Sequence, residues 1–404
     1  MNIDTERSSY RWYHQKWVYD TFVGLMGPEA FASGGIARSF GTIGPEGAQD
    51  NAALRARVKR FSDVTREAKR LAARREGIAK EAEAGKHFVT ARNNYFAAAL
   101  MYGASRWSIW EDNAELVELN ARLVECYKKY AAFADHPVIR LDIPFEGKEL
   151  HGYLHLPGKE DRKWPTILSV QGMDSFKEQG APLYGDKLLE RGFAVLHLDG
   201  PGQGETLVEG MKVTLSNFDK AGKVVYEFLR KRKEVQPDGI GLSGISFGTY
   251  WGPRILAYER RFKVGTFQST CQEPGMKTIF NSALPFFKLR HMFMAGYDDE
   301  EEFDSEYAAK LTLRGIGPKI RCPVFTATGE GDQLSPVQYA IEFHKTLAGP
   351  KRLVIYEGEP HPIADPNLQH ALGDFMLDVY SGKKIQSGIT IVEPGGARRE
   401  LKDA

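Results

Sequence analysis

The sequence predicts an α/β fold in which a mostly parallel, doubly wound sheet of eight strands follows a helical N-terminal region. Two observations support this prediction. From about residue 10 to residue 135, apolar residues recur at helical spacing and no run of β-branched residues indicates a strand. After residue 136, short apolar runs alternate with helical segments, a pattern typical of parallel strands covered by helices on both faces.

The change of pattern divides the chain into parts. We expect residues 1–135 to form a helical cap, residues 136–381 a sheet domain, and residues 382–404 a polar tail that is loosely held. Inside the sheet domain, residues 274–319 are too many for a turn between two strands. They predict an insertion that contributes to a lid over the sheet.

The helical part is expected to hold four helices and one loop. The predicted helices cover residues 10–26, 54–83, 88–110 and 111–133. Residues 34–47 are rich in glycine, with proline and serine, and predict a loop.

The sheet part should begin with a β-hairpin, because residues 138–143 and 150–156 alternate in polarity on either side of Gly147. Six further strands are predicted at residues 166–170, 193–198, 240–244, 264–268, 324–327 and 353–356. Helices are predicted between and after them, at residues 177–191, 217–233, 247–258, 336–347 and 367–380.

The charges of the chain are nearly balanced. Lys and Arg number 54 against 53 Asp and Glu, which leaves a formal net charge of +1. The composition therefore favours neither nucleic acid nor an anionic membrane as a partner. A small neutral molecule is the default substrate.

The cysteines are few and widely spaced. Cys126, Cys271 and Cys322 form no C-x-x-C pair, so they predict neither a disulfide framework nor a zinc site. The polar residues 1–10 lack the pattern of a secretion signal, and no apolar run approaches the ~18 residues of a membrane span. We expect a cytoplasmic protein without a metal or cofactor.

Ser246 is the most conspicuous candidate for chemistry. The pentapeptide Gly244-Ile245-Ser246-Phe247-Gly248 follows a predicted strand and opens a predicted helix. This G-x-S-x-G pattern is typical of a nucleophile elbow, in which a strained turn lifts a serine hydroxyl above the sheet. The alternative is an ordinary serine in a glycine-rich turn.

A serine hydroxyl is a weak nucleophile, so a base and an orienting acid must come from elsewhere in the chain. Asp332 follows the seventh predicted strand and His361 follows the eighth. Because the carboxyl ends of parallel strands meet at one edge of the sheet, we expect a Ser246, Asp332 and His361 triad there. Asp332 could instead cap the next helix, although Ser335 before Pro336 is the better cap; Glu330 is the fallback acid.

An acyl-transfer site also needs hydrogen-bond donors for an oxyanion. The backbone N–H of Phe247 is one candidate, and Gly172 permits a bend that would aim the N–H of Met173 inward. Ser175 and Glu178 match a helix capping box, so Lys177 and Glu178 are interpreted as mainly structural, with Glu178 a weaker candidate for holding the site.

Together these motifs resemble one branch of the α/β-hydrolases. The motifs are residues 172–178, the Asp-Gly-Pro-Gly-Gln-Gly loop at 199–204, residues 244–248, residues 329–332 and His361. The resemblance covers about residues 85–380. It is to the 2,6-dihydroxypseudooxynicotine hydrolase group, to fermentation-respiration-switch-like esterases and to fungal polyketide-shortening hydrolases. It implies an α/β-hydrolase fold with an N-terminal helical cap, a serine triad, usually a dimer and, in several members, hydrolysis of a carbon–carbon bond next to a ketone.

A substrate pocket is expected between the sheet and the cap. Its candidate walls are aromatic or histidine side chains near the serine, in the insertion and in the cap: Trp251, Phe286, Phe287, His291, Tyr95, Tyr102 and Trp107. Such walls would suit an aromatic or bulky apolar acyl compound. The alternative is that these side chains only fill the core.

The sequence thus predicts a serine hydrolase that acts on a small carbonyl compound, cleaving either an ester or a carbon–carbon bond. One alternative is a peptidase of the prolyl-oligopeptidase kind, but a β-propeller should then precede the hydrolase domain. The other is a hydrolase-like binding protein without activity.

Overall fold

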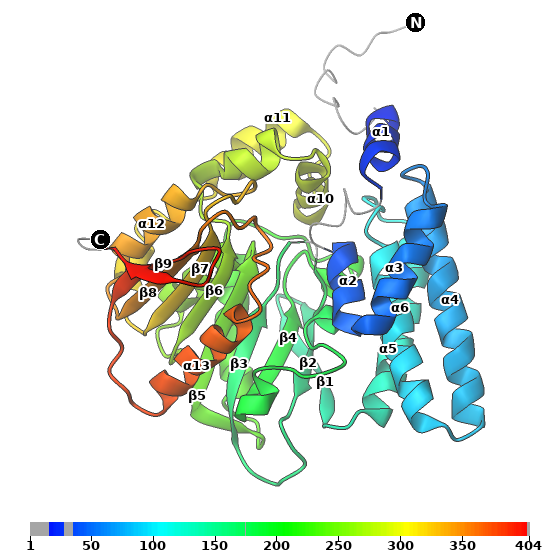
Figure 1. Cartoon of the computed structure of the whole chain (residues 1–404), viewed down its shortest axis with the longest axis horizontal. Coiled ribbons are helices and arrows are strands. Elements are labelled where there is room, and N and C mark those ends of the chain that lie inside the picture. Colours follow the sequence, from blue (N-terminus) through cyan, green and yellow to red (C-terminus); the bar gives the residue numbers. More distant parts are fainter. Residues whose placement is uncertain (1–15, 28–34, 174, 402–404) are drawn as a thin grey trace, which may run out of the picture.

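The computed structural model describes residues 16–27, 35–173 and 175–401. The start of the predicted first helix, residues 10–15, lies outside them. The helical region comprises α1 (Lys16–Met26), α2 (Gly35–Ile43), α3 (Pro45–Arg57), α4 (Asp63–Ala84), α5 (Phe88–Ser105) and α6 (Ala114–Phe133). Figure 1 shows α2 to α6 standing together at one end of the sheet.

Two predictions for this region were wrong. The segment expected to be a loop forms α2 and the start of α3, where Pro45 occupies the first turn, a position that suits its missing N–H. The long charged helix expected from Leu54 is interrupted between α3 and α4. There Phe61 packs its ring against Tyr19 and Trp110, with centroid distances of 5.2 Å to each, and this cluster attaches α1 to the other helices.

The sheet contains the eight predicted strands and two more from the tail. They are β1 (Val138–Phe145), β2 (Lys148–His155), β3 (Trp164–Val170), β4 (Ala194–Asp199), β5 (Val235–Ser246), β6 (Gly265–Thr270), β7 (Val324–Gly329), β8 (Lys351–Tyr356), β9 (Gly388–Val392) and β10 (Arg398–Glu400). The order is β1-β2-β4-β3-β5-β6-β7-β8-β9-β10. Pairing is parallel from β4 to β9 and antiparallel at both ends.

Successive side chains of a strand pack into separate apolar layers on the two faces of the sheet. Ile167 packs in a cluster with Phe375 of α13 (Leu368–Tyr380), whereas its neighbour Leu168 joins the cluster that contains α8 (Asn217–Leu229) and α9 (Gly248–Tyr258). On β8, Leu353 packs with Ala340 of α12 (Val337–Thr346). The predicted mostly parallel α/β fold with helices on both faces is confirmed.

The helix predicted over residues 177–191 does not form. Only two short 3₁₀ turns occur there, η3 (Lys177–Gln179) and η4 (Leu189–Arg191). The chain is instead fixed by side chains: Asp199 accepts a hydrogen bond from the backbone N–H of Lys177 at 2.7 Å, and Asp186 accepts from Leu188 and Leu189 at 2.9 Å. These bonds compete with the backbone pairing of a helix.

The insertion between β6 and β7 is made of short helical pieces. They are η5 (Pro274–Met276), η6 (Thr278–Ser282), α10 (Phe286–Ala295), α11 (Glu300–Glu302), η7 (Phe303–Tyr307), η8 (Ala308–Lys310) and η9 (Gly317–Lys319). A further short helix, α7 (Gly204–Val208), follows β4. α10 meets the helical region directly, because the rings of Phe286 and Trp107 lie 5.0 Å apart.

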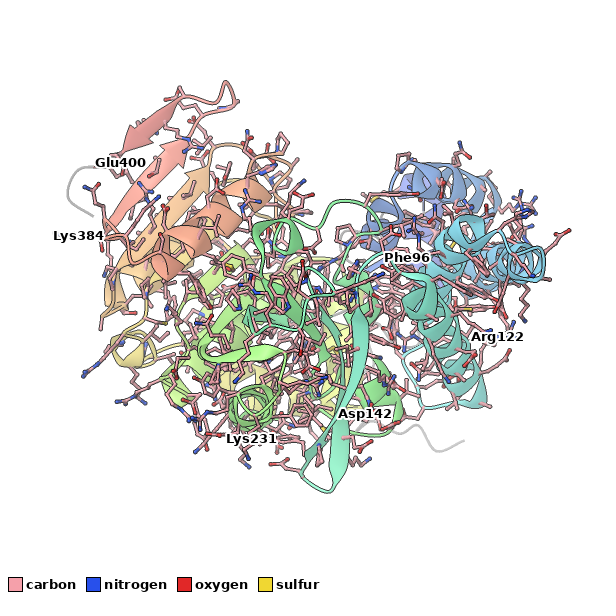
Figure 2. All side chains as sticks on the ribbon, turned by 90° about the horizontal axis from the view of Figure 1, so that it is seen from below. Phe96, Arg122, Asp142, Lys231, Lys384 and Glu400 are labelled. Atoms are coloured by element: carbon pink, nitrogen blue, oxygen red, sulfur yellow. The ribbon has the colours of Figure 1, made fainter. Side chains whose placement is uncertain are left out.

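The tail was predicted to be loosely held, yet it extends the sheet through β9 and β10. Figure 2 shows Lys384 and Glu400 at one flank of the molecule and Phe96 and Arg122, on α5 and α6, at the opposite flank. None of the helices in the described ranges is both long and apolar enough to span a membrane.

Candidate active site

Ser246 lies at the end of β5, one residue before the N-cap of α9. Its backbone φ is +53°, a conformation that non-glycine residues adopt rarely and that is strained. The glycines around it are required by contact: a Cβ on Gly248 would lie 2.2 Å from the carbonyl oxygen of Val170, and one on Gly244 would lie 2.5 Å from that of Gly248. The turn therefore has the geometry of a nucleophile elbow.

Three side chains predicted from the sequence meet at this turn. The Nε2 of His361 lies 2.8 Å from the Oγ of Ser246, and the Nδ1 of His361 lies 2.8 Å from the Oδ2 of Asp332. Because a carboxylate accepts hydrogen bonds, Nδ1 donates to Asp332 and Nε2 is left to accept from the serine hydroxyl. Asp332 and His361 are buried, whereas Ser246 is partly exposed.

Asp332 is fixed by its second carboxylate oxygen. Oδ1 accepts hydrogen bonds from the backbone N–H groups of Leu334 and Ser335, at 2.8 and 2.9 Å. The cap expected from Ser335 is wrong, since α12 begins after Pro336 and the Ser335 hydroxyl accepts from the backbone of Gln272 at 3.3 Å. Exposed Glu330, the fallback acid, accepts from the N–H of Gly358 at 3.1 Å.

The loops that carry Asp332 and His361 touch each other. The backbone N–H of Gly331 donates to the carbonyl of Glu359 at 3.0 Å, and that of His361 donates to the Gln333 side chain at 3.3 Å. At Gly329 an added Cβ would lie 2.2 Å from the carbonyl oxygen of Glu359. The acid and the imidazole are thus held by one packed pair of loops.

The loop after β3 lies against the serine turn. A Cβ on Gly172 would lie 3.2 Å from the Cβ of Ser246, so only glycine allows this approach. Gln203 holds the loop: its side-chain amide donates to the carbonyl of Gly172 at 2.6 Å and accepts from the N–H of Gly200 at 3.2 Å. Met173 and Phe247, the two predicted oxyanion donors, flank this contact and are buried.

A buried ion cluster anchors the next residues of the same loop. The Nζ of Lys177 lies 2.8 Å from Glu178, 3.0 Å from Asp199 and 2.8 Å from Glu205. Burial alone would lower the pKa of Lys177, but the carboxylates raise it above its ordinary value. Burial raises the pKa of Glu178 despite the lysine. The capping box predicted for Ser175 and Glu178 is absent, because η3 begins after Phe176.

Cys271 was not singled out from the sequence, yet it borders the serine. Its Sγ lies 3.9 Å from the Oγ of Ser246, and its backbone N–H donates to Thr249 at 2.7 Å. The residue follows β6, the strand beside β5, and that position in the chain is the only signal that could have found it.

The predicted pocket residues separate into two groups. Tyr95 and Tyr102 are turned toward α4, where their hydroxyls donate to Glu83 at 2.6 Å and to Glu76 at 2.8 Å. They lie inside the helical region and are not brought together with Ser246.

Of the other pocket residues, His291 and Trp251 pack against Phe247 of the serine turn. The ring of His291 lies 4.5 Å from that of Phe247, and its Nε2 is 3.2 Å from the hydroxyl of Tyr307. Burial lowers the pKa of His291 to about 3. Trp251 stacks on Phe218 at 4.1 Å, and Phe286 contacts both Phe287 and Trp107.

Two hollows bear on where a ligand could bind. The larger, of about 710 Å³, lies between β1 and the end of α8 and includes none of the three triad candidates. The smaller, of about 10 Å³, lies between the end of α5, the loop after β3 and α10. Only the smaller hollow lies between the sheet and the helical region, where the pocket was expected.

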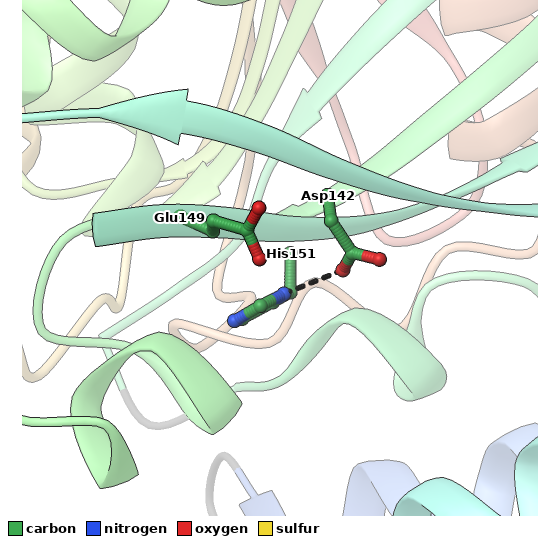
Figure 3. Close-up of side chains that lie close together, drawn as sticks. All are labelled: Asp142, Glu149 and His151. Carbon is green, nitrogen blue, oxygen red and sulfur yellow. Dashed lines mark hydrogen bonds and ion pairs between the residues drawn. The ribbon is translucent and has the colours of Figure 1, made fainter. Parts of the chain in front are cut away.

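A second group of titratable side chains lies on the β1–β2 hairpin, with Asp142, Glu149 and His151 drawn in Figure 3. Their ligand atoms are close enough to hold a metal ion. The guanidinium of Arg140 already lies 2.8 Å from Asp142 and 2.9 Å from the Nδ1 of His151. Arg140 therefore supplies the cation that pairs with Asp142, and these two residues with His151 form an ion-pair cluster.

The sheet order, the serine elbow and the loops after β7 and β8 define an α/β-hydrolase. The chain belongs to the esterase FrsA-like family, whose model matches residues 72–338. This match includes Ser246 and Asp332 and ends before His361. The class recognised from the sequence motifs is confirmed.

Two hydrolases are among the proteins that are similar to this chain. The α/β-hydrolase XenA of Xenoacremonium sinensis is 32% identical over 202 residues, which are 48% of this chain and 48% of that protein. The 2,6-dihydropseudooxynicotine hydrolase of Paenarthrobacter nicotinovorans is 26% identical over 273 residues, covering 66% of this chain and 71% of that protein. The chain thus spans about half the length of the fungal relative.

Solved structures share the fold over most of the chain. The crystal structure of a 2,6-dihydroxy-pseudo-oxynicotine hydrolase superposes with a TM-score of 0.75 at 23% identity, over 87% of this chain and 98% of that one. The structure of AbyA5 gives a TM-score of 0.67 at 17% identity, over 84% and 91%. The likeness extends beyond the sheet, because it covers more of the chain than residues 136–381 alone.

Proposed function

We propose that this chain is a serine hydrolase in which Ser246 is the nucleophile, His361 the general base and Asp332 the group that orients His361. The observation that carries the proposal is the unbroken hydrogen-bond chain from the Ser246 hydroxyl through both nitrogens of His361 to Asp332. Membership of an esterase family supports it.

In the proposed mechanism, Nε2 of His361 takes the proton of Ser246 as its Oγ attacks the carbonyl carbon of the substrate. The oxyanion that forms accepts hydrogen bonds from the backbone N–H groups of Met173 and Phe247. Protonated His361 then gives its proton to the leaving group, and a water molecule activated by the same imidazole releases the acyl group from Ser246.

The proposed substrate is a small carbonyl compound with an aromatic or bulky apolar body. A leaving alcohol would make the enzyme an esterase, in keeping with the family's name. A leaving carbanion stabilised by a neighbouring carbonyl or an electron-rich ring would make it a carbon–carbon hydrolase, which the resemblance noted from the sequence implies. We further propose that residues 1–135 act as the cap over this site and that residues 136–381 form the catalytic domain.

Two parts of the proposal concern the whole protein. We propose that the protein acts in the cytoplasm, because its three widely spaced cysteines indicate no disulfide framework. It would also act as a homodimer, as the resemblance implies. Light scattering during gel filtration tests the dimer directly, and a single species with the mass of one chain would contradict it.

The catalytic proposal is tested with a fluorophosphonate probe and a substrate panel. The wild type should be labelled and should turn over a compound from a panel of p-nitrophenyl esters, β-diketones and aryl ketones. Ser246→Ala should lose both the labelling and the turnover while keeping its circular dichroism spectrum. Labelling of Ser246→Ala equal to that of the wild type would contradict the assignment.

The peptidase alternative has less support, because the described residues before the sheet are helical and form no β-propeller. A binding protein without activity would have no need of the strained backbone at Ser246. The fluorophosphonate probe distinguishes this binding protein from an enzyme. Failure of the folded wild type to react would favour the binding protein.

A further inference from the structure

The small hollow between the helical region and α10 is lined by charged and aromatic side chains. Its walls include Arg106 and Trp107 after α5, Ser175 and Phe176 after β3, Gly204 at the start of α7, and Arg290 on α10. We call this hollow the arginine chamber. Its volume of about 10 Å³ is roughly that needed by one water molecule.

The arginine chamber adjoins the proposed nucleophile. A Cβ on Gly172 would lie 3.2 Å from the Cβ of Ser246 and 3.6 Å from the Oγ of Ser175, so the two serines flank the same glycine. Ser175 is also part of the chamber wall. A substrate whose carbonyl lies at Ser246 would therefore have the chamber close by, on the side of the helical region.

Arg106 is buried without a matching anion. Its side chain is only 5% exposed. Nη1 donates to Asn120 at 2.6 Å, and Cζ lies 5.1 Å from the ring centroid of Phe176. Its Nε has no hydrogen-bond partner among the described residues. A buried guanidinium that keeps an unused donor is costly, which points to a missing acceptor.

The carboxylates nearest to Arg106 are engaged elsewhere. Glu178, Asp199 and Glu205 all contact the Nζ of Lys177, and Glu205 also accepts from Arg140 at 2.8 Å. Burial lowers the pKa of Arg106 while these carboxylates act to raise it, and a guanidinium remains protonated in proteins. Arg106 thus carries a charge that no acid within ion-pairing distance in the described structure balances.

We propose that Arg106 binds a carboxylate on the substrate, so that the enzyme prefers acyl compounds that carry a negative charge. The inference rests on the proposed function, because it assigns a substrate class to that same site. It also departs from the neutral substrate that the balanced composition favoured. A carboxylate would accept from Nε and replace the partner that Arg106 lacks.

The aromatic residues around the arginine chamber would contact the body of such a substrate. The chamber is too small for an acyl compound as it stands, so Trp107 in its wall must separate from Phe286 of α10, whose ring lies 5.0 Å away, when substrate binds. An apolar or aromatic body would then lie between these rings, with its carboxylate at Arg106.

The test compares two esters of equal length, mono-p-nitrophenyl glutarate and p-nitrophenyl valerate, which differ by one carboxylate. The wild type should favour the glutarate in kcat/KM by about tenfold to a hundredfold, the usual strength of a hydrogen bond to a charged group. Arg106→Gln should abolish this ratio and Arg106→Lys should retain part of it. Arg92→Gln on α5, the helix that ends just before Arg106, is the matched control and should leave the ratio unchanged, since Arg92 donates to Asn93 and Asp135.

Asn120→Asp covers the case in which Arg106→Gln fails to fold. The new carboxylate would accept from Nη1 of Arg106, at the position of the present amide oxygen, and would pair with the charge of the guanidinium. The preference for the glutarate should therefore fall, while the shape of the site is kept. An unchanged ratio in folded Arg106→Gln or Asn120→Asp would overturn the inference.

A binding measurement separates failure of this inference from failure of the proposed function. Calorimetry on Ser246→Ala compares 4-phenylbutyrate with its neutral amide, and no catalysis is involved. The inference is supported if Ser246→Ala binds the carboxylate more tightly than the amide and if the double variant Ser246→Ala with Arg106→Gln does not. This result would hold even if neither ester is hydrolysed. Equal binding of the acid and the amide overturns it even if Ser246-dependent hydrolysis is observed.

Discussion

The side chain of Gln203 and the backbone of Gly172 form a 2.6 Å hydrogen bond that joins the loop after β4 to the loop after β3. Gly172 in turn lies against Ser246. The Asp-Gly-Pro-Gly-Gln-Gly segment therefore positions the loop after β3, on which the proposed donor Met173 lies.

Loss of this bond should impair turnover more than binding. Gln203→Ala leaves the carbonyl of Gly172 with only the longer hydrogen bond from the backbone N–H of Ser175, at 3.3 Å. A shift of the loop by about 1 Å would lower kcat by about tenfold to a hundredfold. KM should change little. Steady-state kinetics with an active p-nitrophenyl ester provide the measurement. Gln369→Ala, which removes an exposed side chain on α13, is the control, and a change confined to KM would contradict the prediction.

Asp332 is expected to be the acid of the triad, because it alone contacts His361 through a carboxylate oxygen among the described residues. In a Ser-His-Asp triad, an Asp to Asn change allows the wrong tautomer of the histidine and lowers kcat by roughly 10⁴-fold. Asp332→Asn should show a loss of this order. Glu330→Gln, two residues away, should retain wild-type turnover, and the reverse result would make Glu330 the acid.

Lys177 should matter for stability. Lys177→Met would leave Glu178, Asp199 and Glu205 buried without their shared cation, which costs about 3–5 kcal/mol in the free energy of unfolding. Lys187→Met removes an ion pair with Glu190 that is much more exposed, and it should cost less than about 1 kcal/mol. Urea unfolding compares the two variants. Equal stability of both would show that the buried cluster contributes nothing.

His151 should make the stability of the protein depend on pH. Burial would lower its pKa, but hydrogen bonds to Glu209 and Asp142 raise the pKa above its ordinary value. Arg140, which also contacts the Nδ1 of His151, is paired with Asp142 and Glu205. Because the folded state holds the proton more tightly, the stabilisation is complete below about pH 6.5 and is lost as pH rises through the raised pKa.

His151→Gln should therefore lose a component of stability that is present at acidic pH and absent at alkaline pH. The measurement is the difference in the free energy of unfolding between wild type and variant, taken at several pH values above 5. This difference should shrink as pH rises. His370→Gln, at an exposed position, is the control. A difference that grows with pH would contradict the sign of the effect.

The triad candidates could be placed from the sequence because each follows a strand, and parallel strands bring such positions to one edge of the sheet. Tyr95 and Tyr102 could not be placed in the same way. They lie on α5, which is buried on nearly all sides, so the spacing of its apolar residues does not show which side faces the sheet.

Other features depend on contacts between distant segments. The helix predicted after Lys177 fails because Asp199, far along the chain, takes the backbone N–H that would start it. The sequence does not indicate a role for Arg106, because charged residues are mostly exposed. Its burial follows only from the packing of Phe176 and Asn120 around it.

The last strand, β10, has a bearing on how the protein behaves at high concentration. Without residues 388–400, the outer strand at this edge of the sheet would be β8, whose Leu353, Val354 and Ile355 form an apolar run. With the tail in place, the outer strand is only Arg398, Arg399 and Glu400, which are all exposed. Short charged borders of this kind resist strand-to-strand aggregation, so a truncated chain that ends at Tyr380 should precipitate more readily than the full one.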